Sequence, residues 1–389
     1  MGSEMCIRDR LGEAGTLAST VSMSGGTLDA DESLTLSGAL TQSGNITIDV
    51  KAGETLTYSG AAVSLGANTL TLSGGGTLGN TNALVLNNAD SKLLLNSITV
   101  GSASTSADSL GVDVDANSTV TSLSVGHITP VSIDTGKTLS GAITVSAGSL
   151  KLTEAGTLAS SVSMSGGTLD ADESLTLSGA LSQSGDIAID VTTGKTLTYS
   201  GASLNLGANK LTLTGGGTFN NTNSLVLNNA DSLLSLSGIL TIRDVDGTTS
   251  SNSGKGIQVI SSATLGDYDL SAVSYLSIAA NKTLAGQLNL QTNGELKTSG
   301  DGQYTGDIAL EGGKFSATDS QVLGGTLSIT ADSELTVSQG HTLTLSQAGG
   351  LALGANALTI SGGGSFVSGG VTLNNADSKL LLNSITLDL

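Results

Sequence analysis

A long stretch that returns almost unchanged further along the chain is the feature that most limits the fold. Residues 13–100 come back without a gap as residues 154–241. A third copy is weak at its start (301–315), but its end, NNADSKLLLNSIT at 374–386, repeats 87–99 letter for letter. Internal repeats indicate an array of similar units, and they override the two or three globular domains that the length would otherwise suggest.

A shorter period lies inside each copy. Similar segments start at Leu139, Leu158 and Leu177, and a TLTYSG segment follows at about the same interval. Aliphatic and small polar residues alternate in each, as in Asn45–Val50, which is typical of a half-buried strand. Gly, Asn, Asp and Ser cluster between these segments and favour tight corners. The pattern predicts coils of about 19–22 residues and almost no helix.

One such coil cannot bury its own aliphatic side chains, but stacked coils bury them against one another and pair their backbone groups. The sequence therefore predicts an all-β chain folded as a β-solenoid. We expect a right-handed parallel β-helix, because strict hexapeptides are absent. At a strand spacing of ~4.8 Å, some nineteen coils would form a rod of roughly 90 Å. An antiparallel sandwich or barrel is the rival, but it does not need near-identical segments offset by whole coils.

Composition excludes several classes of protein. One Cys excludes a disulfide scaffold, and 38% hydrophobic residues are too many for ordinary disorder. No apolar run approaches ~20 residues, so we expect no membrane span in this segment. With three Arg and 33 acidic residues, a nucleic-acid partner is not expected either, because phosphate contacts need clustered cations.

The two ends differ from the repeats. Residues 1–10 (MGSEMCIRDR) fit no repeat, and we expect them to be a non-native or artefactual leader. We expect residues 11–389 to form a single solenoid. The chain stops in mid-strand at Ser384–Leu389, so we expect a piece of a longer protein, with any export signal or anchor outside it. The long repeats within the solenoid are predicted at about 13–153, 154–299 and 300–389, the last one truncated.

An acidic cluster is the one candidate metal site. Asp29 and Asp31 recur as Asp170 and Asp172, and alternate carboxylates of an extended segment point the same way, so each pair could hold Ca²⁺. The third copy lacks the cluster, and a solvated acidic turn is the favoured interpretation. No other cofactor is expected.

Other motifs predict structure rather than chemistry. Residues 243–247 start like an EF-hand loop, but the twelfth position is Lys255 instead of Glu. The two histidines, His127 and His341, are about ten coils apart, and each is expected at the surface or a corner. The GGGT motif lacks the GK[ST] ending of a phosphate loop. The Asn residues of NNAD are expected to bond corners to neighbouring coils; the motif occurs at 87–90, 228–231 and 374–377.

Segments such as GGTLDADESLTLSGAL, AGTLASSVSMSGG and GANTLTLSGGGTL resemble the repeats of bacterial β-helical surface proteins. These include autotransporter passengers and filamentous-haemagglutinin-type adhesins. The resemblance covers nearly all of residues 11–389. It implies an exported, elongated protein that is extracellular or on the bacterial cell surface.

Three classes of function follow. The first is a structural or adhesive rod without enzymatic activity, which could self-associate end to end or bind glycans or proteins of a host or neighbouring surface. The second is a carbohydrate-active β-helix enzyme, a polysaccharide lyase or hydrolase, for which the irregular stretch from Arg243 to Tyr275 is the place to look. The third is a module that binds Ca²⁺, ice or glycan; interrupted rows of outward Thr argue against ice. We expect the first.

Overall fold

The residues that the computed structural model describes are 8–11, 14–80, 82–229, 231–237, 241–242, 245–247 and 256–389. They contain strands and no helix. The strands pair in parallel with strands of neighbouring turns, so the chain coils into a β-solenoid, as predicted. The chain forms two compact units, Met1–Ile187 with Ser200–Ala202, and Ala188–Tyr199 with Ser203–Leu389.

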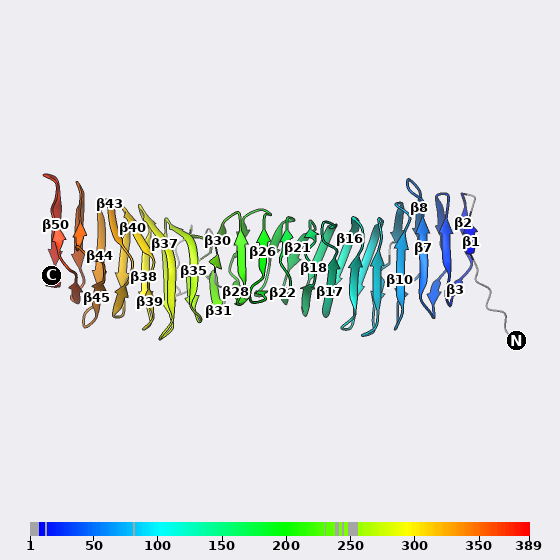
Figure 1. Cartoon of the computed structure of the whole chain (residues 1–389), viewed down its shortest axis with the longest axis horizontal. Helices are drawn as coiled ribbons and strands as arrows, with labels where there is room; N and C mark the ends of the chain where they lie inside the picture. Colours follow the sequence, from blue (N-terminus) through cyan, green and yellow to red (C-terminus); the bar gives the residue numbers. More distant parts are fainter. Residues whose placement is uncertain are drawn as a thin grey trace. The chain divides into compact units, whose positions relative to one another are not determined.

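The strands of successive turns lie side by side in the N-terminal unit (Figure 1), and each turn has three sides. The first side is formed by β1 (Arg8–Leu11), β4 (Thr27–Ala30), β7 (Ile46–Val50), β10 (Thr69–Ser73), β13 (Lys92–Leu95), β15 (Gly111–Val114), β17 (Ile128–Ile133), β19 (Ser149–Leu152) and β22 (Thr168–Ala171). The second side is formed by β2 (Thr16–Leu17), β5 (Leu34–Leu36), β8 (Thr55–Tyr58), β11 (Thr77–Asn80), β20 (Thr157–Leu158) and β23 (Leu175–Leu177). The third side is formed by β3 (Val21–Met23), β6 (Leu40–Gln42), β9 (Val63–Ser64), β12 (Leu84–Leu86), β21 (Ser161–Met164) and β24 (Leu181–Gln183). Longer strands cover both the second and third sides in β14 (Thr99–Thr105), β16 (Ser118–Val125) and β18 (Thr138–Val145).

The C-terminal unit repeats this arrangement. Its first side is formed by β25 (Ile187–Val191), whose first residue belongs to the other unit, and by β28 (Lys210–Gly215), β31 (Leu233–Ser237), β34 (Gly256–Val259), β36 (Val273–Ile278), β38 (Glu295–Ser299), β41 (Lys314–Ala317), β44 (Ser333–Val337), β47 (Ala357–Ser361) and β50 (Lys379–Asn383). Its second side is formed by β26 (Thr196–Tyr199), β29 (Thr218–Asn221), β32 (Thr241–Ile242), β39 (Gln303–Tyr304), β42 (Gln321–Leu323), β45 (Thr342–Leu345), β48 (Ser365–Val367) and β51 (Thr386–Asp388). Its third side is formed by β27 (Leu204–Asn205), β30 (Leu225–Leu227), β33 (Val245–Gly247), β40 (Asp307–Glu311), β43 (Leu327–Ala331), β46 (Leu351–Ala352) and β49 (Val371–Thr372). Two strands again cover both of the later sides, β35 (Ala263–Leu270) and β37 (Thr283–Gln291).

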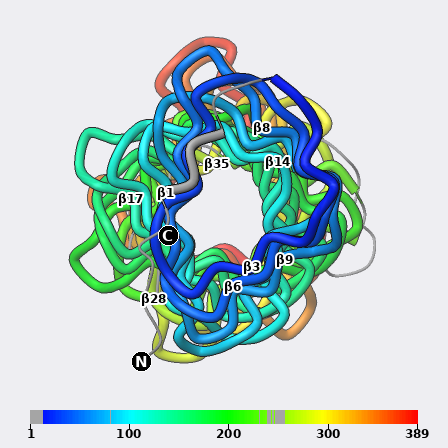
Figure 2. The backbone as a smooth tube through the Cα atoms, turned by 90° about the vertical axis from the view of Figure 1, so that its right-hand side faces the viewer, coloured from blue at the N-terminus to red at the C-terminus, as the bar shows by residue number. Residues whose placement is uncertain are grey.

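The coil of the N-terminal unit is right-handed. In Figure 2 the first turns, in blue, are nearest the viewer, with β1 and β17 on the left, β8 and β14 at the top and right, and β3, β6 and β9 at the bottom. The chain therefore runs clockwise as it recedes, as expected for a right-handed parallel β-helix.

The core consists of ladders of aliphatic side chains inside the coil. Leu70 is in register with Ile46 on the turn before it and with Leu93 on the turn after it, and all three are almost fully buried. Every second residue of these strands points inward, which is why the alternation in the sequence predicts them. Burying each Leu or Ile stabilises the fold by about 1.5–3 kcal/mol.

Turn length varies more than the sequence predicted. Lys151 and Asp170 are in register on successive turns and lie 19 positions apart in the sequence, whereas Thr336 and Ser361, also in register, lie 25 apart. The expected upper limit of the coil length is therefore wrong. The extra residues lie in the loops between strands, where they leave the inward alternation intact.

The triple glycine of the GGGT motif is required by a crossing of two turns. Gly74 has a φ of 102°, and a Cβ there would lie 2.3 Å from the Val50 carbonyl oxygen of the previous turn. A Cβ on Gly76 would lie 2.5 Å from the Lys51 carbonyl oxygen. The motif therefore brings two backbones together, which is a structural role.

Segment 1–10, predicted to be an artefactual leader, is described only from Arg8. Residues 8–11 form β1, whose backbone is in register with β4. This pairing does not report on the origin of the segment, so the leader and the predicted boundaries of the long repeats stay predictions.

Candidate functional site

The acidic pair Asp170 and Asp172, predicted as a calcium site, lies in β22 and just after it. The Nζ atom of Lys151, on β19, is 3.2 Å from a carboxylate oxygen of Asp170 and 2.7 Å from one of Asp172. The hydrogen bond to Asp172 is the main cause that raises the pKa of Lys151. A lysine ammonium group therefore stands beside both carboxylates, where the sequence predicted a cation.

The equivalent pair in the first copy has different neighbours. Asp29 is in register with Arg10 on β1 and with Asp49 on β7. The Lys51 ammonium group donates a hydrogen bond to the backbone carbonyl oxygen of Asp31 at 3.2 Å. Among the described residues, no group of three or more His, Cys, Asp or Glu side chains is placed to hold a metal ion. Calcium binding by the two aspartate pairs stays a prediction.

The NNAD motif forms a corner that ties two turns together. The Oδ1 atom of Asn87 accepts a hydrogen bond from the Gly66 N–H of the previous turn at 2.9 Å, and that of Asn88 accepts one from the Asp90 N–H at 3.0 Å. The buried Ser91 hydroxyl accepts from the Asn88 N–H and donates to the Gly66 carbonyl. The predicted corner role is therefore confirmed. The same bonds recur at Asn228, Asn229 and Ser232 and at Asn374, Asn375 and Ser378.

The two histidines lie on different turns, and the irregular stretch is only partly described. His127 is exposed at the corner before β17, and His341 lies at the corner before β45, as predicted for each. Arg243, Asp244 and Lys255 lie outside the described residues. Two residues of this stretch that the structure does describe, Tyr268 and Asp269, bond within the solenoid: the Tyr268 hydroxyl donates to Ser274 Oγ at 2.7 Å, and Asp269 accepts from Asn289 at 2.6 Å.

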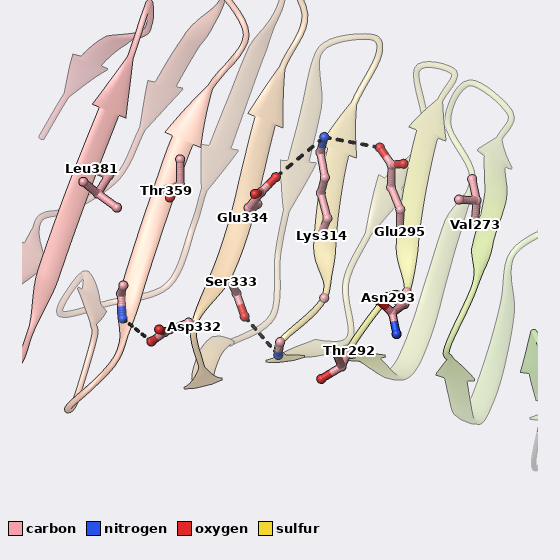
Figure 3. A pocket seen from close by; sticks show the side chains of 14 residues that line it. Val273, Thr292, Asn293, Glu295, Lys314, Asp332, Ser333, Glu334, Thr359 and Leu381 are labelled. Carbon is pink, nitrogen blue, oxygen red and sulfur yellow. Dashed lines mark hydrogen bonds and ion pairs between the residues drawn. The ribbon is translucent and has the colours of Figure 1, made fainter.

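A row of polar and charged side chains runs across the outer face of the first side in the C-terminal unit (Figure 3). Glu295, Lys314 and Glu334 occupy matching positions on β38, β41 and β44. The Lys314 Nζ atom lies between them, 3.7 Å from Glu295 Oε1 and 3.8 Å from Glu334 Oε2. Val273 precedes this row in register, and Thr359 follows it. We call these five residues the charged row.

A shallow depression of about 530 Å³ follows the charged row. Asn293 and Asp332 line its edge at the corners before the strands, and Ser333 lines it at the first position of β44 (Figure 3). Asp332 accepts a hydrogen bond from the Ala357 N–H at 2.8 Å, and Ser333 accepts one from the Gly312 N–H at 3.1 Å. These corner bonds hold the rim in place.

One aromatic side chain lies next to the charged row. Tyr275 stands two residues after Val273 on β36 and is half-buried, whereas the other seven aromatic residues of the chain are buried. The Nζ atom of Lys297, its register partner on β38, lies 5.5 Å from the centre of the Tyr275 ring. Lys297 also lies 3.9 Å from a Glu295 carboxylate oxygen, which connects the ring to the charged row.

Sequence reasoning did not find this site. The signal was present, because Glu295, Lys314 and Glu334 follow one another at intervals of one turn each. The length of a turn changes along the chain, so only the strand register shows which residues share a row.

No family model, curated protein or solved structure matches this chain. In the part of the chain that the structure describes, no helix is long and apolar enough to cross a membrane.

Proposed function

We propose that this chain is a structural and adhesive β-solenoid that works outside the cell or on the bacterial cell surface and has no enzymatic activity. The observation that carries the proposal is the corner built three times with the same hydrogen bonds, at Ser91, Ser232 and Ser378. Near-duplicate turns are expected in a protein whose length and repeated surface carry its function, whereas an enzyme needs only one active site.

The sequence resemblance to autotransporter passengers and filamentous-haemagglutinin-type adhesins supports the same proposal. Its partners would be glycans or proteins of a host or neighbouring surface, or further copies of this chain stacked end to end. Repeated faces favour weak contacts that add up through multivalency.

Antibody labelling tests the location. Antibodies raised against the purified chain should label intact cells of the source organism, and external protease should remove the label. Labelling only after permeabilisation would contradict the proposal. Incubation of the protein with neutral and polyanionic glycans should release no reducing ends and no unsaturated products; release of either would favour the lyase or hydrolase alternative.

A further inference from the structure

The outward-facing aromatic ring is the feature of the outer surface that the fold does not explain. Four of the five tyrosines are 2% exposed or less, and three of them fix turns through their hydroxyls, such as Tyr58, which donates to the Ala61 carbonyl, and Tyr304. Tyr275 faces outward instead, on the solvent side of β36. Its role therefore lies outside core packing.

The surroundings of Tyr275 are asymmetric. The residue in register on the next turn is Lys297, whose ammonium group lies by the ring. The residue in register on the previous turn is Gly256, which has no side chain. An aromatic ring flanked in this way offers an apolar face, with charged hydrogen-bonding groups along one edge.

The Lys314–Glu334 pair of the charged row contributes little to stability, which leaves the Glu334 carboxylate available for a ligand. The ion pairs of the row measure 3.7 and 3.8 Å, and the Glu334 side chain is 56% exposed. Exposed pairs of this kind stabilise a fold by only about 0–1 kcal/mol. Glu295 is only 21% exposed and also accepts a hydrogen bond from Ser316 Oγ at 2.7 Å. Carboxylates that alternate with an ammonium group can accept hydrogen bonds from the hydroxyl groups of a ligand and donate hydrogen bonds to them along the same row.

We propose that the face formed by Tyr275, Lys297 and the charged row binds a neutral oligosaccharide. Sugar rings stack on aromatic faces through their C–H groups, and their hydroxyls bond to carboxylates, amides and ammonium groups. Carboxylates outnumber ammonium groups on this face: the carboxylates are Glu295, Asp332 and Glu334, and the ammonium groups are Lys297 and Lys314. This excess of negative charge disfavours a polyanion. The depression falls within the usual volume range of ligand sites; the charged row lines it, whereas Tyr275 and Lys297 lie outside its lining.

The geometry favours a chain of sugars over a single sugar. From Val273 on β36 to Leu381 on β50 the lining residues occupy six successive strands, so at ~4.8 Å per strand the face is roughly 24 Å long. The site names a ligand class for the adhesive role, and its biological meaning rests on that proposed function. Sugar binding by the purified protein and antibody labelling of intact cells are independent measurements, so a failure of one proposal can be told from a failure of the other.

Calorimetric titration of the full chain with cellohexaose, maltohexaose and mannohexaose tests the proposal, with polygalacturonate as the anionic comparison. We expect at least one neutral hexasaccharide to bind and polygalacturonate not to bind. Tyr275→Ala should weaken this binding by about tenfold. Glu334→Gln should weaken it as well, and this exposed residue can change without affecting the fold.

Lys92→Ala is the matched control, because Lys92 forms a charge pair with Asp113 on the same side of the N-terminal unit. It should leave the affinity unchanged within twofold. The chain has no Trp, so tyrosine emission is visible directly, and the bound sugar should protect Tyr275 from acrylamide quenching. No binding of the three hexasaccharides, or equal binding by Tyr275→Ala and the unaltered chain, would overturn the proposal.

Discussion

At the scale of single residues, the outer face of the solenoid is a set of charge rows whose members are set by register. Lys151 pairs with its register partner Asp170 one turn further on. Lys92 pairs diagonally with Asp113, which stands two positions after its own register partner Gly111. A residue therefore acquires its electrostatic partner from another turn, and the local sequence does not reveal it.

Asp115 carries an unfavourable charge in the folded chain. Partial desolvation and the nearby charges of Asp113 and Asp134 raise the pKa of its carboxyl group, while Lys92 lowers it. Because the folded-state pKa is raised, ionised Asp115 destabilises the fold at neutral pH, and this penalty disappears as the pH falls through that pKa. Because Asp115 is exposed and solvent screens its charge, Asp115→Asn should raise the free energy of unfolding by only about 0–0.5 kcal/mol at pH 7, with no gain below pH ~3.

Urea denaturation at both pH values measures the effect. Asp113→Asn, which breaks the 2.5 Å pair with Lys92, is the comparison and should not stabilise the chain at pH 7. A gain for Asp115→Asn that stayed constant down to pH 3 would contradict this origin.

The predicted calcium sites can be tested through Lys151. Its ammonium group must move before a cation can sit between Asp170 and Asp172. We expect Lys151→Ala to show a larger rise in melting temperature on addition of millimolar Ca²⁺ than the unaltered chain. Thermal melts with Ca²⁺ and with Mg²⁺ measure this. Equal shifts for both proteins would count against calcium at this pair.

At the scale of elements, corners carry the hydrogen bonds that link one turn to the next. The Ser91 hydroxyl is buried and bonds both to its own corner and to the Gly66 carbonyl of the previous turn. Strand side chains supply the apolar core, so the two kinds of element contribute different interactions. Loss of a corner bond leaves polar groups buried without partners.

Ser91→Ala should therefore lower the free energy of unfolding by about 1–3 kcal/mol, and Ser232→Ala in the second copy should have a similar effect. Ser124→Ala is the control, because Ser124 is exposed on the outside of β16 and should change stability by less than about 0.5 kcal/mol. Guanidinium melts of the three variants provide the comparison. An effect of Ser91→Ala no larger than that of Ser124→Ala would show that the corner is not an energetic link.

At the scale of the whole molecule, stability is the sum of nearly equivalent turns, each in contact with its neighbours. Ser149 is in register with Thr168, and Leu158 with Leu177, so the segment 149–167 makes up one complete turn. Removing one turn should then leave the remaining pairings intact.

Deletion of residues 149–167 should give a chain that folds and melts within about 5 °C of the original, because Leu169 takes the place of Leu150. Deletion of 149–158 is the matched control: it removes about half a turn and puts strands of different sides in register. Circular dichroism and thermal melts distinguish the two. A folded half-turn deletion, or an unfolded whole-turn deletion, would contradict the stacked-turn account.

The sequence by itself determined the all-β class, the coiling and the inward side chains, because a short alternation of apolar and polar residues inside a longer repeat of whole coils admits few other folds. It also predicted that Asn88 and its copies are structural. Only the tertiary structure decided which residues share a row. Loop insertions make some turns longer than others, so the neighbour of Asp170 or Tyr275 depends on the length of the turn that separates the two strands, which the local sequence does not show.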